Sequence, residues 1–166
     1  MLTSDLLPRL SIGTWPTPVR RLDQASADLG TEVWAKVEES CGAWGGNKVR
    51  KLEYILAHAK NKGAKHLVTY GAGTSSWAAA VVLHGSAMGF DVTLGLGGDV
   101  PEHYRALYEK RGVTVHKAPS YNLTPLAAAK AVIAAGPKAM RLAAGGSDRR
   151  GDLGSMSAGA EIADDV

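Results

Sequence analysis

Apolar side chains recur at helical spacing in the stretch that follows residue 48. The apolar positions are Val49, Leu52, Ile55, Leu56 and Ala59. They would form one buried face of a helix, because residues three and four apart lie on the same side. Gly63 follows the last apolar turn and is a candidate C-cap. The pattern therefore predicts an amphipathic helix that ends near residue 63.

Short runs of β-forming residues alternate with helical runs along the rest of the chain. Strands are predicted at residues 66–70, 91–96, 113–117 and 138–142. Helices are predicted at residues 77–88, 101–110 and 124–135, and a last helix from about Leu153. Strands that alternate with helices of this length form a parallel sheet. We therefore predict an α/β fold with an open parallel sheet and helices on both faces.

The chain before residue 48 is less regular. Prolines discourage regular structure over residues 1–17. A short helix is predicted at residues 22–29, where Gly30 closes the last turn. Alternating side chains predict a strand at residues 32–37. A glycine-rich loop then leads into the helix that follows residue 48.

The composition limits the classes of function. The 166 residues are 45% hydrophobic and 21% charged, with 20 glycines, which is typical of one globular core with many tight turns. The net charge is only +3, and no run of Lys and Arg exceeds two residues, so we expect neither nucleic-acid nor membrane binding. No segment approaches the ~20 apolar residues of a membrane span, and we predict a cytoplasmic protein.

Metal chemistry is not expected either. Cys41 is the only cysteine, which excludes an internal disulfide and a cysteine-based metal framework. The five histidines show no pairing at the spacing of metal ligands. The basic residues are better explained by local sites for anions.

The segment GAWGGNKVRKLEY, at residues 42–54, has the features of an anion site. It places Lys48, Arg50 and Lys51 in the first turn of a helix, where the N-terminal dipole disfavours positive charge unless an anion is bound. Gly45 and Gly46 let the backbone and its N–H groups come close to a phosphate. A lysine amine with a lowered pKa also forms a Schiff base with an aldehyde, and pyridoxal phosphate carries both groups. The alternative is that Lys48 is an ordinary solvated lysine.

A second candidate site is the turn TYGAGTSSW, where a predicted strand ends and a helix begins. Ligands of open parallel sheets bind at the carboxyl ends of strands, and a helix start offers free N–H groups to a carboxylate. Ser75 and Ser76 lie at this point, directly before Trp77. In the alternative interpretation, Ser75 is only the N-cap of the helix, and Gly71 and Gly73 are turn residues. The two roles do not exclude each other.

These segments, in their order and spacing, resemble one family. GGNKVRKLEY, together with WPTPVRRLDQASADLG and VWAKVEESCG before it and LVTYGAGTSSWAAA and AAGGSD after it, is similar to the fold-type II pyridoxal-phosphate enzymes. The similarity is to the branch of 1-aminocyclopropane-1-carboxylate deaminase and D-cysteine desulfhydrase. It covers essentially the whole chain, but only about the first half of the family. It implies a fold like the tryptophan synthase β small domain plus part of the large domain.

The resemblance implies roles for the residues of both candidate sites. Lys48 would bind pyridoxal phosphate through a Schiff base and then move protons on the substrate, and Asn47 and Lys51 would bind the phosphate. Ser75 would be a catalytic hydroxyl that faces the substrate amino acid. The family also places the segment at residues 16–18 and the GGSD loop near the active site. From the residues alone, Asp148 in that loop indicates a solvated turn.

Two positions depart from the family pattern, which has Ser-Asn followed by a polar residue. Ser76 takes the place of the asparagine that meets the phenolic oxygen of the cofactor, so the contact would be weaker or mediated by water. Trp77 follows it. As a substrate-binding residue together with Ser75 and Ser76, Trp77 would narrow the pocket; as the first apolar residue of a buried helix, it would belong to the core. The sequence leaves both roles of Trp77 open.

The resemblance implies three parts and one type of reaction. Residues 1–49 would belong to the large domain, residues 50–154 to the small α/β domain, and residues 155–166 to the returning large domain. The reaction would be elimination or deamination of a small amino acid to a keto acid and ammonia. The rest of the site would come from a second polypeptide or a homo-oligomer, or the chain would be a fragment or an inactive half. A non-catalytic subunit that binds phosphate or an amino acid is the alternative.

Overall fold

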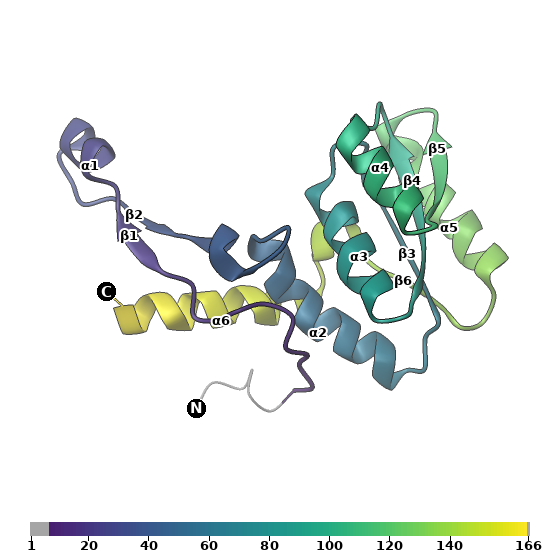
Figure 1. Ribbon diagram of the computed structural model, residues 1–166, viewed down its shortest axis with the longest axis horizontal. Helices are drawn as coiled ribbons and strands as arrows, with labels where there is room; N and C mark the ends of the chain where they lie inside the picture. Colours follow the sequence, from purple (N-terminus) through teal and green to yellow (C-terminus); the bar gives the residue numbers. More distant parts are fainter. Residues whose placement is uncertain (1–6, 166) are drawn as a thin grey trace.

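The fold is centred on a four-stranded parallel sheet. The computed structural model describes residues 7–165. The strands are β3 (His66–Ala72), β4 (Asp91–Gly97), β5 (Thr114–Ala118) and β6 (Ala139–Arg141), and their spatial order is β5-β4-β3-β6 (Figure 1). Each neighbouring pair is parallel. The predicted parallel sheet is therefore confirmed.

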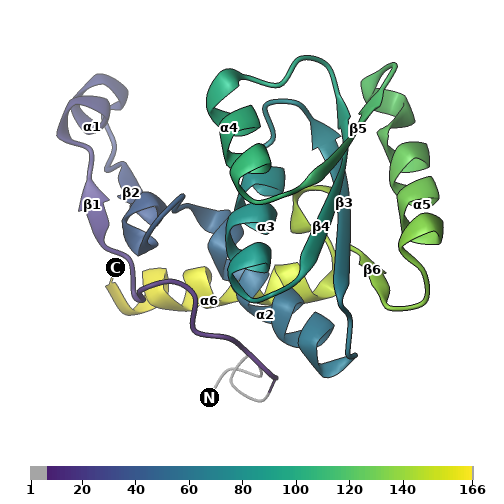
Figure 2. The same cartoon turned by 45° about the vertical axis from the view of Figure 1, so that its right-hand side comes forward.

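Helices cover both faces of this sheet. On one face lie α3 (Ser76–Ala87) and α4 (Glu102–Lys110), and on the other lies α5 (Thr124–Ala135), which follows the short 3-10 turn η3 (Tyr121–Leu123) (Figure 2). The predicted ranges of these three helices agree with the structure to within one residue. An α/β fold with helices on both faces is thereby confirmed.

The alternation of side chains along β3 divides the core into two parts. Leu67 belongs to the larger cluster, which also holds Leu94 and the apolar side of α3. Val68 points to the opposite face and packs with Ala128 and Ala131 of α5. Because successive residues of a strand face opposite sides, a strand buried on both faces reads as a continuous apolar run.

Helix α2 (Asn47–Asn61) carries the apolar stripe expected after residue 48. Leu52, Ile55 and Leu56 are fully buried in the larger core cluster. Lys62 is the C-cap, and Gly63 follows with a φ of 67°, in the left-handed region that favours glycine. The helix and its end match the prediction.

A small antiparallel hairpin projects away from the sheet (Figure 1). Strands β1 (Val19–Arg21) and β2 (Trp34–Lys36) pair with each other, and α1 (Asp23–Leu29) lies between them. Strand β2 is the strand predicted at residues 32–37. Strand β1 was not predicted, because its sequence, one valine and two arginines, shows no alternation of apolar and polar side chains. A turn of 3-10 helix, η2 (Glu38–Cys41), connects this hairpin to α2.

The last helix, α6 (Arg149–Asp165), runs beside α2 (Figures 1 and 2). It starts four residues before the predicted Leu153, because Asp148 caps it: Oδ1 of Asp148 accepts the N–H groups of Arg150 and Gly151, each at 2.9 Å. Met156 and Ile162 remain 47% and 41% exposed. The expectation that the apolar residues of this helix need more core than the chain supplies agrees with that exposure.

Among residues 7–165, no helix combines the length and the apolar character needed to cross a bilayer.

Candidate active site

The loop before α2 requires the glycine pair Gly45 and Gly46. Gly46, the N-cap, has a φ of 125°, which side-chain-bearing residues rarely adopt. A Cβ on Gly45 would collide with the carbonyl oxygen of Glu39. The N–H of Gly46 donates to the carbonyl of Glu38 at 3.0 Å. The close approach of backbone expected from the glycine pair is therefore present at the start of the helix.

Lys48 occupies the second position of α2 and is partly buried. Its pKa is lowered, first by burial and then by the positive charge of Lys51. Both effects favour the neutral amine. The amine at position 48 therefore has a larger nucleophilic fraction near neutral pH than that of a solvated lysine.

Arg50 does not contribute to the anion site that the sequence suggested. Its side chain is 1% exposed and is held by carboxylates of the chain itself. Nε donates to Glu38 at 2.6 Å, and Nη2 donates to Glu161 at 2.6 Å. The guanidinium also lies 3.9 Å from the ring centre of Trp15. The expectation that all three cations of the first turn face an anion is thus wrong for Arg50; Lys48 and Lys51 remain.

The Ser75 turn caps α3. The hydroxyl of Ser75 accepts the N–H of Ala78 at 3.2 Å, and its carbonyl accepts the N–H of Ala79 at 3.2 Å. The N–H groups of Ser76 and Trp77 precede these and have no carbonyl one turn back within the helix. The capping role of Ser75 is thereby observed, and the two preceding N–H groups are left for a ligand or water.

Gly73 holds this turn against the end of the neighbouring strand. Its N–H donates to the carbonyl of Gly97 at 2.8 Å, and a Cβ at this position would overlap the carbonyl of Asp99. The Ser75 turn therefore lies at the carboxyl edge of the sheet, where ligands of open α/β folds bind.

Trp77 is a core residue in this structure. Its side chain is 2% exposed, and its Nε1–H donates to Oγ1 of Thr69 at 2.9 Å. The indole has one polar atom, and that atom is already paired inside the protein. Of the two roles left open by the sequence, the geometry supports packing, and it leaves Trp77 no polar group for a substrate.

The turn η4 (Ala144–Gly146) brings the starts of α2 and α3 together. A Cβ on Gly146 would lie 2.8 Å from the ring of Trp77 and 3.3 Å from Cδ of Lys51. Gly146 has a φ of 64° as well. The lysine helix, the Ser75 turn and the GGSD loop are therefore adjacent, although they are far apart in the sequence.

The predicted site residues differ in exposure. Asn47 and Ser76 are exposed, and Lys51 and Ser75 are partly buried, as Lys48 is. Asp148, from the GGSD loop, is the cap of α6 rather than a free carboxylate. Asn47, Lys48, Ser75 and Ser76 are thus all at least partly exposed at the starts of α2 and α3.

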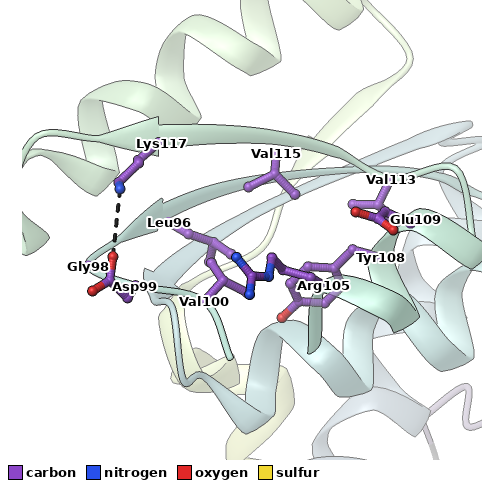
Figure 3. Close-up of a pocket in the computed structure, with 10 residues that line it drawn as sticks. All are labelled: Leu96, Gly98, Asp99, Val100, Arg105, Tyr108, Glu109, Val113, Val115 and Lys117. Atoms are coloured by element: carbon purple, nitrogen blue, oxygen red, sulfur yellow. Dashed lines mark ion pairs between the residues drawn. The ribbon is translucent and has the colours of Figure 1, made fainter. Parts of the chain in front are cut away.

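A separate hollow of about 590 Å³ lies between α4 and the edge strand β5 (Figure 3). Leu96, Val113 and Val115 form its apolar lining, with Arg105 and Lys117 among its charged residues. Neither Lys48 nor Ser75 lines this hollow. We therefore do not assign the predicted chemistry to it.

The comparison with protein families decides the classification. The model of the family described as pyridoxal-phosphate dependent enzyme matches residues 10–166. This chain belongs to that family. The cofactor of the family is pyridoxal phosphate. The resemblance seen in the sequence is thereby confirmed, and it extends over nearly all of the chain.

Among the similar pyridoxal-phosphate dependent enzymes is a protein of Pyrococcus furiosus provisionally named 1-aminocyclopropane-1-carboxylate deaminase. It is 34% identical over 164 residues, which are 95% of this chain and 50% of that protein. A D-cysteine desulfhydrase of Klebsiella pneumoniae is 32% identical over 171 residues, 94% of this chain and 51% of that protein. The chain therefore spans about half the length of these relatives.

A solved structure of a homologue of 1-aminocyclopropane-1-carboxylate deaminase superimposes with a TM-score of 0.84 at 32% identity. The match covers 95% of this chain and 50% of that one. A fungal L-serine ammonia-lyase from Rhizomucor miehei superimposes with a TM-score of 0.70 at 14% identity, covering 93% and 46%. At that identity the second match shows the fold alone. Both comparisons confirm the fold-type II architecture.

Sequence reasoning missed Glu53. Its carboxylate is fully buried and accepts hydrogen bonds from Arg9, Trp15 and the N–H groups of Ile12 and Gly13 at 2.6 to 3.0 Å. The irregular segment before β1 is thus fixed to the lysine helix. A signal was present, because Glu53 lies four residues after Val49 on the apolar stripe, where a charge must be paired.

Proposed function

We propose that this chain is part of a pyridoxal-phosphate-dependent lyase or deaminase that converts a small amino acid to a keto acid and ammonia. The observation that supports it most is the amine of Lys48. It lies at a glycine-bounded helix start and has a lowered pKa. Gly146 brings the helix that carries it, through Lys51, next to Trp77 at the start of the helix that Ser75 caps. Family membership and relatives named for deamination and desulfhydration agree with this proposal.

The residues present fit the cofactor. Lys48 provides an amine of lowered pKa for the aldehyde, and Lys51 provides a cation beside it for the phosphate. Asn47 is exposed at the first position of α2, where its amide and the free N–H groups of the helix start can meet phosphate oxygens. When bound, pyridoxal phosphate supplies an electron sink for the carbon that loses a proton.

The chain's own residues then bind and orient the substrate. The N–H groups of Ser76 and Trp77 would hold the substrate carboxylate at the start of α3. The hydroxyl of Ser75 would face the substrate, and that of Ser76 would approach the phenolic oxygen of the cofactor. The amine of Lys48 would take a proton from the substrate and return it. Its lowered pKa suits this exchange near neutral pH.

We propose that a second polypeptide, a second copy or further sequence completes the site. The chain spans about half of its relatives. Residues 1–49 and 155–166 would belong to a large domain, and residues 50–154 to the small one. The exposure of Met156 and Ile162 on α6 supports a further packing partner.

A binding module without catalysis is the second candidate. It is favoured by Ser76, which stands where the family has an asparagine for the phenolic oxygen of the cofactor. A module of this kind would hold a phosphate or an amino acid at the same helix starts without turning it over.

Product formation separates the two candidates. The protein, isolated with the polypeptides that accompany it, is given pyridoxal phosphate and a panel of small amino acids, and keto acid and ammonia are measured. We expect saturable formation of both from at least one amino acid, and its loss in Lys48→Ala. Binding of amino acid or phosphate with no product from any of them would instead support the module.

A further inference from the structure

Glu38 contacts the start of α2 on both sides of Lys48. Its carbonyl accepts the N–H of Gly46, two residues before Lys48, at 3.0 Å. Its carboxylate accepts from Arg50, two residues after Lys48, with Oε2 at 2.6 Å from Nε and Oε1 at 2.8 Å from Nη2. Glu38, which lies outside α2, therefore holds both the backbone of Gly46 before Lys48 and the side chain of Arg50 after it.

We infer that Glu38 is a positioning residue that fixes the direction and the burial of the Lys48 side chain. This inference rests on the proposed function of Lys48. The contacts of Glu38 with Gly46 and Arg50 keep the loop before α2 and the first turn of α2 in one arrangement. Without the carboxylate of Glu38, the loop at Gly46 would be free to move relative to the helix, and the amine of Lys48 would gain exposure.

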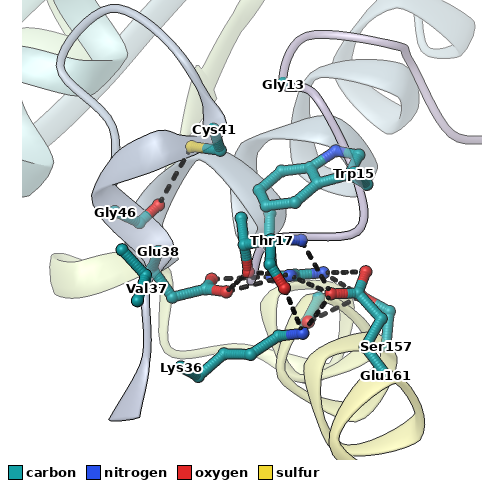
Figure 4. Close-up of polar contacts among 12 residues, drawn as sticks. Gly13, Trp15, Thr17, Lys36, Val37, Glu38, Cys41, Gly46, Ser157 and Glu161 are labelled. Atoms are coloured by element: carbon teal, nitrogen blue, oxygen red, sulfur yellow. Dashed lines mark hydrogen bonds and ion pairs between the residues drawn. The ribbon is translucent and has the colours of Figure 1, made fainter. Parts of the chain in front are cut away.

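The carboxylate of Glu38 is itself fixed. The hydroxyl of Thr17 donates to Oε1 of Glu38 at 2.7 Å (Figure 4). Nη2 of Arg50 donates to the same Thr17 oxygen at 3.1 Å. Charge-assisted bidentate pairs of this kind are among the strongest and most directional hydrogen bonds in proteins. The carboxylate of Glu38 is therefore held from two sides, by Thr17 and by Arg50.

Glu161 is a natural control for this role. It accepts from the same guanidinium, with Oε1 at 2.8 Å from Nη1 and Oε2 at 2.6 Å from Nη2. It lies on α6 and is also bound by Lys36 at 2.9 Å. Within residues 7–165, none of its hydrogen bonds or ion pairs reaches the loop through Gly45 and Gly46 that leads to Lys48. Removal of the Glu161 side chain thus takes a carboxylate from Arg50 while leaving both contacts of Glu38. Removal of the Glu38 side chain keeps its backbone hydrogen bond to Gly46 but breaks the connection from there to Arg50.

The test measures the amine of Lys48 directly. The intact protein without cofactor is modified with an amine-selective reagent over a range of pH, and the peptide that contains Lys48 is quantified by mass spectrometry. In Glu38→Ala, we expect the midpoint of modification to rise by about 0.5 pH unit or more, because exposure of the amine restores its charged form. In Glu161→Ala, we expect the midpoint to stay at the wild-type value. Glu38→Gln, which keeps the shape and one acceptor, should fall between wild type and Glu38→Ala.

Equal midpoints in Glu38→Ala and Glu161→Ala would overturn the inference and leave Glu38 a purely structural partner of Arg50. If Glu38→Ala does not fold, Glu38→Gln against Glu161→Gln makes the same comparison, and equal midpoints overturn it in the same way. Because no cofactor is added, this result is independent of the proposed function. A protein that never binds pyridoxal phosphate would refute the proposed function and still report whether Glu38 controls Lys48.

Discussion

The carboxylate of Glu53 accepts the indole N–H of Trp15 at 2.8 Å, which fastens the segment before β1 to the lysine helix. Glu53→Ala should lower the free energy of unfolding by about 3 kcal/mol, because it leaves buried donors and the Arg9 cation without their acceptor. Urea denaturation measures the loss. The control is Glu102→Ala, which breaks an exposed ion pair with Arg105. It should leave the urea concentration at the midpoint of unfolding unchanged. Equal effects of the two substitutions would contradict the role of Glu53.

Gly154 is where α6 touches the backbone of α2. A Cβ there would lie 2.6 Å from the carbonyl carbon of Arg50 and 2.7 Å from its oxygen. Gly154→Ala should therefore push the helices apart and destabilise the protein by about 1–3 kcal/mol. Gly159→Ala on the same helix meets nothing within 4 Å and should raise stability by up to about 1 kcal/mol through helix propensity. Thermal unfolding of the variants Gly154→Ala and Gly159→Ala tests the contact between α6 and α2. A Gly154→Ala variant as stable as the wild type would refute this contact.

The hydrogen bond between Trp77 and Thr69 gives a prediction about the core. Trp77→Phe removes the donor to Oγ1 of Thr69 and should cost about 1 kcal/mol of stability. Because the indole is buried, the KM for an amino acid substrate should not change. A KM that rises several-fold with no loss of stability would instead place Trp77 in the substrate pocket.

Glu161 gives a pH dependence at acidic pH. Burial raises the pKa of Glu161, but hydrogen bonds from Arg50 and Lys36 outweigh this effect and lower it to about 2. The unfolded state then binds more protons than the folded state above this value, so the contribution of Glu161 to stability is complete above its unfolded pKa and is lost as pH falls through about 2. Acid titration of the unfolding free energy should therefore show a shallower decline in Glu161→Gln than in wild type. If the unfolding free energy fell equally steeply with pH in Glu161→Gln and in wild type, the ion pairs of Glu161 would be contradicted.

The elements that carry the candidate site followed from short-range patterns. The stripe that begins at Val49, the glycine pair before Lys48 and the strand that begins at His66 are all readable within a few residues. The roles of Lys48, Asn47, Lys51, Ser75 and Ser76 stay predictions, as do the domain boundaries and the amino acid that is converted.

The side-chain network around Arg50 could not be predicted in the same way. Its partner Glu161 is 111 residues away in the sequence, so a first-turn cation that looked free for an anion is instead neutralised inside the fold. A count of the charges along one helix does not include partners from distant segments of the chain. The start of α6 was missed by four residues for a related reason: the cap at Asp148 lies in a loop that reads as a solvated turn.

The most direct test of the account is covalent attachment of pyridoxal phosphate at Lys48. The intact protein, with the polypeptides that accompany it, is incubated with pyridoxal phosphate, its visible absorption is recorded, and the sample is reduced with borohydride and mapped by mass spectrometry. We predict a visible band, permanent labelling of the peptide that contains Lys48, and loss of both in Lys48→Ala. A visible band that survives in Lys48→Ala, or a fixed label on a different lysine, would contradict the central claim.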